Sequence, residues 1–243
     1  MDSQSAGATP IPRKLITILV ALYEAGSFIQ AKLQNLRQLC NFDDCWIVLL
    51  NCENKHNEAD AYADFVAQYS NVIAIRYVDH VNLYTTWNHG IITTNSTYVM
   101  NSNVDDMLHT EYVRTCTQYL DANRKIAAVS SKILVTDVPN QVGPDWEYQH
   151  AMPFLAYPLA TAGPCPVWRK SLHYKYGLFD PRCEVVGDAI MWEKWVIGGE
   201  TFGLIDQPLA LYYRNPGSLE RRRDNYGVSL IDKDLQRLGR TDG

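Results

Sequence analysis

Apolar residues in this chain gather in short runs that alternate with segments of helical periodicity. Compact runs rich in β-branched residues predict strands buried on both faces at residues 15–22, 45–50, 72–77 and 98–100. Apolar residues at helix-like intervals predict helices at residues 31–39, 58–69 and 83–93. This alternation predicts an α/β fold with a mostly parallel central sheet flanked by helices, in which ligands bind beyond the carboxyl ends of the strands.

The pattern changes in the second half of the chain. Residues 136–166 are rich in proline, glycine and aromatic residues and form too long a stretch for a simple connection, which predicts a functional loop region. Regular patterns then predict helices at residues 167–176 and 189–197, and strands at residues 201–205 and 209–213. With no repeat or linker, one domain is predicted over residues 13–218, between a polar leader (1–12) and a charged tail (219–243).

Composition and charge narrow the functional classes. Of 243 residues, 47% are hydrophobic and 20% are charged, as in a globular protein with a sizeable core. The 22 basic and 27 acidic residues give a net charge of −5, so no overall positive field attracts nucleic acid or anionic lipid. The longest apolar run, residues 15–22, is far shorter than the roughly 20 residues that span a bilayer, and the polar start lacks the features of a secretory signal. These features favour a cytoplasmic protein, in which the six scattered cysteines are reduced.

An acidic motif, Asn103-Val104-Asp105-Asp106, follows directly after a predicted strand. Its carboxylates are therefore expected at the edge of the sheet, in the ligand crevice. Mg²⁺ and Mn²⁺ prefer such oxygen ligands and commonly join one or two carboxylates to the phosphates of a substrate. The alternative is that Asp105 and Asp106 cap a helix that starts near His109, because aspartate is favoured at that position.

Several further motifs follow one another in a specific order. The chain carries Trp87-Asn88-His89-Gly90 on a predicted helix, a strand that leads to Asn103-Val104-Asp105, then Trp168-Arg169-Lys170-Ser171-Leu172-His173, Tyr176-Gly177-Leu178-Phe179-Asp180, Gly187-Asp188 and Tyr212-Tyr213-Arg214. In these motifs and their order, the chain resembles the family-2 glycosyltransferases over most of its length. The resemblance implies the A-type nucleotide-sugar fold, with a nucleotide-binding half over about residues 13–110 and an acceptor-side half over about residues 111–218.

The resemblance also implies a reaction and a set of site residues. Most enzymes of this family move a sugar from a nucleoside diphosphate donor, here most readily a UDP-sugar, to an acceptor hydroxyl with inversion at the anomeric carbon. Asp188 is the implied general base, and an N-cap of the following helix is its alternative role. Asp105 is the implied ligand of the divalent cation, Mn²⁺ or Mg²⁺. The other implied residues are Asn88, Asn103, Glu53 and Arg214 on the donor side, and Trp168 and Glu184 on the acceptor side. Glu184 is a second candidate for the base, and the alternative role of Trp168 is to brace the loop.

Two departures from the family pattern concern the donor. Asn103 stands where the family usually has the first aspartate of its metal motif, which leaves Asp105 as the main metal ligand. Ala21-Leu22-Tyr23-Glu24 replaces a more usual Tyr-Asn pair, and Asn51-Cys52-Glu53 stands where an aspartate commonly contacts the base. The run Arg221-Arg222-Arg223 either supplies a cation to the leaving group, as an alternative to Arg214, or forms a solvated surface.

The remaining aromatic and imidazole side chains have structural interpretations. Trp192 and Trp195 recur at helical spacing, which predicts packing in the core. His173 lies on a predicted helix beside Leu172, where a hydrogen-bonded structural histidine is the commoner case.

Two other functions stay open at this stage. A sugar nucleotidyltransferase shares an alternating fold and a metal site, but it normally has a glycine-rich loop after the first strand, where this chain has only Gly26. A non-catalytic domain that binds a sugar nucleotide or a glycan is favoured by Asn103 and opposed by Asp105 and Asp188. The acceptor is equally open: a glycan, a lipid-linked glycan, a protein or a modified nucleic acid can present a hydroxyl, although the acidic net charge disfavours the last.

Overall fold

The computed structural model describes residues 11–52, 58–140, 151–152, 163–223 and 227–240. Its strands are β1 (Lys14–Leu22), β2 (Cys45–Asn51), β3 (Val72–Arg76), β4 (Ser96–Asn101), β5 (Met107–Leu108), β6 (Ile126–Thr136), β7 (Ala151–Met152), β8 (Val167–Arg169) and β9 (Thr201–Tyr213). Its helices are α1 (Ile29–Arg37), α2 (Glu58–Gln68), α3 (Leu83–Thr93), α4 (Tyr112–Ala122), α5 (Leu172–Tyr176), α6 (Gly187–Ile197) and α7 (Leu230–Arg237), with short 3₁₀ turns η1 (Phe42–Asp44) and η2 (Leu219–Arg221). Among these described residues, no helix is both long and apolar enough to cross a bilayer.

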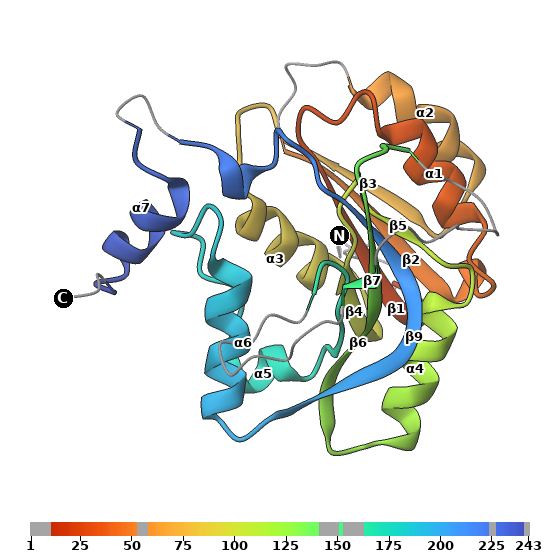
Figure 1. Cartoon of the computed structure of the whole chain (residues 1–243). Helices are drawn as coiled ribbons and strands as arrows, with labels where there is room; N and C mark the ends of the chain where they lie inside the picture. Colours follow the sequence, from red (N-terminus) through yellow and green to blue (C-terminus); the bar gives the residue numbers. More distant parts are fainter. Residues whose placement is uncertain (1–10, 53–57, 141–150, 153–162, 224–226, 241–243) are drawn as a thin grey trace, which may run out of the picture.

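The strands of the described residues form one sheet in the order β3-β2-β1-β4-β8-β6-β9-β5, with β7 paired to β6. The first four are parallel to one another, as are β6 and β9, whereas β8, β5 and β7 run antiparallel to their neighbours. Parallel pairing brings the carboxyl ends of β1, β2 and β4 to the same edge, where ligands bind in open α/β sheets. The predicted α/β fold with helices on both faces of the sheet is confirmed (Figure 1).

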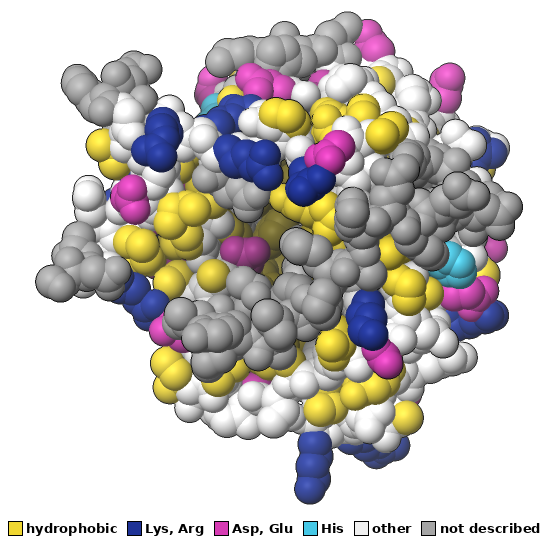
Figure 2. Space-filling view, in the orientation of Figure 1, with side chains coloured by type: hydrophobic (Ala, Val, Ile, Leu, Met, Phe, Trp, Pro, Cys, Tyr) yellow, Lys and Arg dark blue, Asp and Glu magenta, His cyan; other side chains and the backbone are white. Residues whose placement is uncertain are grey.

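The surface in this orientation is hollowed near its centre. Figure 2 shows an acidic side chain inside the hollow and lysine and arginine side chains along its upper rim. Hydrophobic side chains also line the hollow, and such a mixture of apolar and charged groups is typical of ligand sites.

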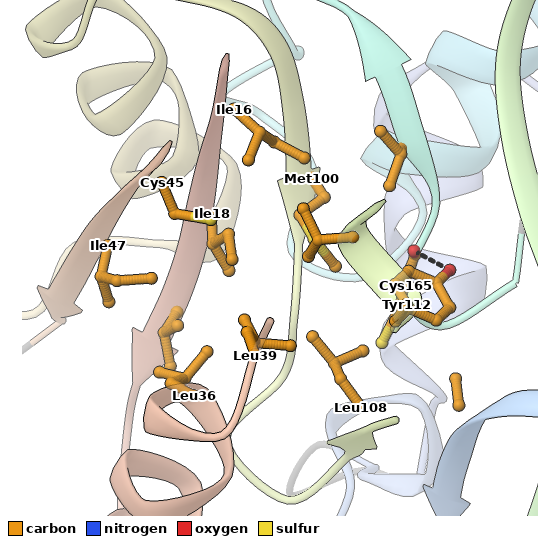
Figure 3. Close-up of a cluster of buried hydrophobic side chains, with 14 of the residues drawn as sticks. Ile16, Ile18, Leu36, Leu39, Cys45, Ile47, Met100, Leu108, Tyr112 and Cys165 are labelled. Atoms are coloured by element: carbon orange, nitrogen blue, oxygen red, sulfur yellow. Dashed lines mark hydrogen bonds between the residues drawn. The ribbon is translucent and has the colours of Figure 1, made fainter. Parts of the chain in front are cut away.

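Two apolar cores lie on opposite faces of the sheet, because strand side chains alternate between faces. On β1, Ile16, Ile18 and Val20 point into the core beneath α1, α2 and α4, while Leu19 points into the core beneath α3, α5 and α6. Figure 3 shows part of the first core, where side chains of β1, β2 and β4 meet those of α1. Burial on both faces explains why these strands read as continuous apolar runs.

The structure differs from the predicted elements in three places. Residues 167–176 were predicted as one helix, but Val167–Arg169 form β8 and only Leu172–Tyr176 are helical. The two strands predicted at residues 201–205 and 209–213 are one strand, β9, whose pairing with β6 shifts register near Pro208. The charged tail contains a helix, α7, which packs against the domain. The loop region predicted at residues 136–166 lies largely outside the described residues.

Candidate functional site

Two buried asparagines mark the carboxyl edge of the parallel strands. Asn51 ends β2 and Asn101 ends β4, and their side chains are 1% and 5% exposed. Each amide nitrogen has a partner, but neither side-chain oxygen accepts a hydrogen bond from any described residue. A buried acceptor without a partner is costly, so these two oxygens indicate a place where a ligand or water donates hydrogen bonds.

The acidic loop follows Asn101 at the same edge. Asp105 is half-buried, and its Oδ2 accepts a hydrogen bond of 2.9 Å from the amide of Asn215, which follows β9. Asp106 is fully buried and accepts hydrogen bonds from the Asn103 amide at 3.1 Å and from the backbone N–H of Tyr213 at 3.3 Å. The alternative of a helix cap is wrong, because the next helix, α4, starts at residue 112 with Glu111 as its N-cap.

A buried lysine on α1 holds the Asp105 loop by hydrogen bonds. Lys32 on α1 is 1% exposed, and its ammonium donates to Ser102 Oγ at 2.6 Å and to the backbone carbonyl of Asp106 at 2.7 Å. Burial lowers the pKa of Lys32, while burial and the neighbouring Asp105 raise the pKa of Asp106 well above its usual range. Lys32 was not among the predicted site residues, although its place on the apolar face of α1, beside Leu33 and Leu36, was a detectable signal.

The chemistry of the loop fits a hard divalent cation. The described residues contain no group of three or more His, Cys, Asp or Glu side chains that could enclose a metal. Mg²⁺, however, is usually held by one or two carboxylates together with water and substrate phosphates. Asp105 provides one carboxylate beside amide groups of Asn103 and Asn215, so this donor set suits a cation that arrives with a diphosphate.

The second carboxylate of interest, Asp188, lies in the first turn of α6. Helix α6 begins at Gly187 with Val186 as its N-cap, so Asp188 is inside the helix and does not occupy the N-cap position considered for it. Its Oδ1 accepts from the backbone N–H of Ala189 at 2.8 Å and lies 3.0 Å from the Tyr84 hydroxyl. Burial, and then the charge of Asp188, raise the pKa of Tyr84 well above its usual range, so the hydroxyl keeps its proton and acts as a donor.

Asn88, in the predicted helix motif, makes a structural contact. Asn88 on α3 is 8% exposed, and its amide brackets the backbone of Phe179: its nitrogen donates to the Phe179 carbonyl at 2.9 Å, and its oxygen accepts from the Phe179 N–H at 3.0 Å. This pair of bonds ties α3 to the segment that follows α5. A contact of Asn88 with the nucleotide-sugar donor, as predicted, would be made in addition to these two hydrogen bonds.

The burial of Trp168 favours a bracing role over the alternative of a direct acceptor contact. Trp168 is 0% exposed, because β8 places it in a cluster of aromatic rings with Phe179, Trp192 and Trp195. Trp192 and Trp195 are core residues, as predicted. His173 is structural, as predicted: its Nε2 accepts from the Trp168 indole at 2.9 Å, and its Nδ1 lies 3.0 Å from the Gly177 carbonyl.

Two of the remaining predicted residues form ion pairs elsewhere. Arg214 pairs with Asp137 at the surface, and Glu184 pairs with Arg237 of α7 at 2.8 Å. Glu53 lies outside the described residues. The structure brings none of these into the described contacts of Asp105 or Asp188, and their roles stay predictions.

One arginine of the Arg221–Arg223 run does reach the sheet edge. Arg222 donates to Glu24 at 2.7 Å, and its guanidinium lies 5.5 Å from the centre of the Tyr23 ring. Glu24 follows β1 and has a left-handed backbone with φ of 51°, a conformation that is uncommon outside glycine and often found at functional sites. The segment after β9 therefore crosses the carboxyl edge of the sheet, contacting Asp105 through Asn215 and Glu24 through Arg222.

We compared the sequence and the structure of the chain with those of known proteins. No protein-family model and no curated protein matches the sequence. Among solved structures, the chain is similar to S. aureus TarS 1–349 in complex with UDP-GlcNAc, with a TM-score of 0.68 and 12% identity over 84% of this chain and 60% of that one. It is also similar to the mannosyltransferase PcManGT from Pyrobaculum calidifontis in complex with GDP-Man and Mn²⁺, with a TM-score of 0.66 and 14% identity over 98% of this chain and 68% of that one.

The chain thus spans about 60% of the length of the TarS fragment. Identities of 12% and 14% carry information on the fold, whereas activity is a property of the site. Both similar structures are glycosyltransferases of the A type. The described chain therefore has the A-type glycosyltransferase fold that its motifs predicted.

Proposed function

We propose that this protein is an inverting glycosyltransferase that moves a sugar from a nucleoside diphosphate donor to an acceptor hydroxyl. The observation that carries the proposal is the shared sheet edge, where the unpartnered oxygens of Asn51 and Asn101 lie at the ends of β2 and β4, the two parallel strands on either side of β1. The Asp105 loop follows directly after β4. Hydrogen-bond acceptors for a nucleoside and a carboxylate suited to a diphosphate-bound cation occur together there. The UDP and GDP-mannose complexes of the similar structures support the same donor class.

Asp105 would hold the divalent cation, Mn²⁺ or Mg²⁺, with Asn103 beside it. When bound, this cation would neutralise charge on the diphosphate leaving group. Lys32 and Asp106 would keep the loop in place without touching the donor, because both are buried. Arg222 would add positive charge at the same edge, in preference to Arg214, because Arg222 is held there by Glu24.

Asp188 would act as the general base. Its carboxylate takes the proton of the acceptor hydroxyl while that oxygen forms a bond to the anomeric carbon. The bond from the anomeric carbon to the phosphate oxygen breaks at the same time, and its electron pair leaves with the nucleoside diphosphate. The hydrogen bond from Tyr84 would orient Asp188 toward the acceptor.

The proposal is tested by thermal shift with UDP, GDP, CDP, dTDP and ADP, each with and without Mn²⁺. A ligand that binds only the folded protein raises its melting temperature. We expect one nucleotide to stabilise the wild type only when Mn²⁺ is present, and Asp105→Ala to lose this effect. Asp206→Ala is the matched control, because Asp206 is a surface carboxylate paired with Lys132 on the far strands.

A nucleotide that binds without transfer would favour the non-catalytic alternative. Asn103 is the observation in its favour, because its amide adds no charge to the cation site and is turned toward Asp106. Incubation with the UDP-sugar or GDP-sugar that binds, followed by detection of free nucleoside diphosphate, separates the two. Absence of any nucleotide-dependent shift would contradict both.

A further inference from the structure

Helix α7 docks on the turn that leads into α6 through one buried carboxylate. Asp234 lies within α7 and is 0% exposed. Its carboxylate accepts hydrogen bonds from the backbone N–H groups of Glu184, Val185 and Val186, at distances between 2.7 and 3.1 Å. Figure 1 shows α7 beside this turn and outside the sheet. The charged tail is therefore attached at the entrance to the helix that carries Asp188.

The three N–H groups have no acceptor from their own segment. Val186 is the N-cap residue of α6 and makes no side-chain capping bond, so the start of the helix depends on an acceptor from elsewhere. A buried backbone N–H needs such a partner, and a carboxylate at this position also interacts favourably with the positive end of the helix dipole. Asp234 supplies from α7 the cap that the sequence before α6 lacks.

The turn is also held from its other side. The Tyr84 hydroxyl lies 2.5 Å from the carbonyl oxygen of Val185 and 3.0 Å from Asp188 Oδ1, so its single proton serves both acceptors. Val185 is thus held at both ends of its backbone: its N–H donates to Asp234, and its carbonyl oxygen accepts from the Tyr84 hydroxyl. Arg237 adds a third attachment, since it donates to Glu184 at 2.8 Å and lies 3.4 Å from Asp234.

We infer that Asp234 is a positioning residue for Asp188, an inference that rests on the proposed function. Asp234 holds the turn at residues 184–186, the turn sets where α6 begins, and Asp188 is the second residue of that helix. Loss of the Asp234 carboxylate releases three hydrogen bonds to a charged acceptor and lets the first turn of α6 move relative to the acceptor sugar. Residues of the C-terminal tail therefore belong to the acceptor side of the site.

The test compares Asp234→Asn with Asp232→Asn. Both changes remove one negative charge from α7, but Asp232 is exposed. We expect Asp234→Asn to lower kcat about 10- to 100-fold, because a misplacement of about 1 Å costs this much. The KM for the donor should stay within about twofold, because the donor side does not depend on this turn. Amide hydrogen exchange at residues 184–186 should be faster in Asp234→Asn and unchanged in Asp232→Asn.

A second variant controls for the case in which Asp234→Asn does not fold. Asp234→Glu keeps a carboxylate, and we expect it to fold and to recover part of kcat. Wild-type kcat in Asp234→Asn overturns the inference. A parallel rise in donor KM and in exchange over the whole chain also overturns it, because Asp234 would then serve general stability.

The proposed function fails in a distinguishable way. If the wild type transfers no sugar from any nucleotide that binds it, the proposed function and the role of Asp234 toward a base are both rejected. Exchange at residues 184–186 then still decides whether Asp234 holds the turn.

Discussion

The two carboxylates of the site rest on different kinds of support. The Asp105 loop contacts a buried polar group, in which the Lys32 ammonium donates hydrogen bonds to Ser102 and to the carbonyl of Asp106. The helix of Asp188 lies instead against a cluster of aromatic rings that includes Trp168 and Trp192. The donor side is therefore held by directional, polar contacts, whereas the acceptor side combines aromatic packing along α6 with the Asp234 cap at the start of that helix.

This difference has energetic consequences. Buried charged groups are costly unless every partner is present, so removal of one partner changes both stability and geometry. Aromatic packing is less directional but dense, so it responds to cavities and to added volume. The donor loop should thus be sensitive to the loss of single polar atoms, and the packed length of α6 beyond its first turn to changes of side-chain size.

The largest expected effect separates the two carboxylates by function. Asp188→Asn should lower kcat by about 10²–10⁴-fold, because it removes the general base, and should leave nucleotide binding intact. Asp105→Asn should instead weaken the Mn²⁺-dependent binding of nucleotide. Transfer kinetics together with nucleotide titration by calorimetry provide both values. Full transfer activity in Asp188→Asn would mean that another group acts as the base.

Removal of one ring tests the aromatic support. Trp192→Ala should lower the free energy of unfolding by about 3–5 kcal/mol, because Trp192 is 2% exposed and its loss leaves a cavity. Denaturant titration measures the change. Tyr174→Ala is the control, since Tyr174 is 88% exposed and should have little effect. Equal effects of the two changes would argue against packing as the support of α6.

Loss of the buried ammonium tests the polar support. Lys32→Met keeps the length of the side chain but leaves Ser102 and the Asp106 carbonyl without a donor, which should cost about 1–3 kcal/mol for each acceptor. Nucleotide affinity in the presence of Mn²⁺ should fall as well, because the Asp105 loop loses its anchor. Lys175→Met serves as the control, since Lys175 is exposed and remote from this loop. Unchanged affinity in a destabilised Lys32→Met would confine Lys32 to a folding role.

Two glycines compare a rigid with a flexible neighbour within one apolar core, the core that contains the aromatic cluster. A Cβ on Gly187 would lie 2.7 Å from the rigid ring of Tyr84, whereas a Cβ on Gly90 would lie 2.5 Å from a terminal methyl group of Leu19, an aliphatic side chain that can rotate. Gly187→Ala should therefore cost about 1–3 kcal/mol of stability and lower kcat, and Gly90→Ala should cost less. Melting curves and kcat of the two variants check this order, and the reverse order would contradict it.

The smallest effect concerns pH. Burial lowers the pKa of His173 below its usual value near 6.5, and the nearby Lys170 acts in the same direction. Because the folded pKa is depressed, the neutral ring contributes stability above about pH 6.5 that is lost as the pH falls through the folded pKa. The melting temperature should drop by about 2–4 °C more in the wild type than in His173→Gln between neutral and mildly acidic pH. Parallel curves for the two proteins would exclude this contribution.

The sequence predicted the donor half well because its signals are local. The strands that became β1, β2 and β4 are apolar runs, and their order alone put Asp105 at a carboxyl edge. The acceptor half was harder, since Val167–Arg169 form a strand only through pairing with β4 and β6, which are distant in the chain. The same non-local pairing buries Trp168, which position in a motif could not reveal.

The sequence also did not predict which charged residues are buried. Lys32 meets its partner Asp106 across 74 positions, and Asp234 meets Glu184 across 50. A charged residue in a polar helix is normally exposed. The apolar neighbours of Lys32 were one indication of its burial, whereas only the tertiary contact shows that Asp234 is buried. The resemblance implied Asp188 as a base, but the residues that hold it, Tyr84 and Asp234, belong to no motif that was considered.

The path of the chain after β9 also sets an order for synthesis. Arg222 pairs with Glu24 across 198 positions, and Asp234 secures the turn before Asp188. A ribosome adding about 5–20 residues per second needs roughly 6–25 s to proceed from residue 110 to residue 237. During this interval the nascent protein has the strands of the nucleotide side but not the contacts that complete the acceptor side, so the chain gains its full site only late in translation.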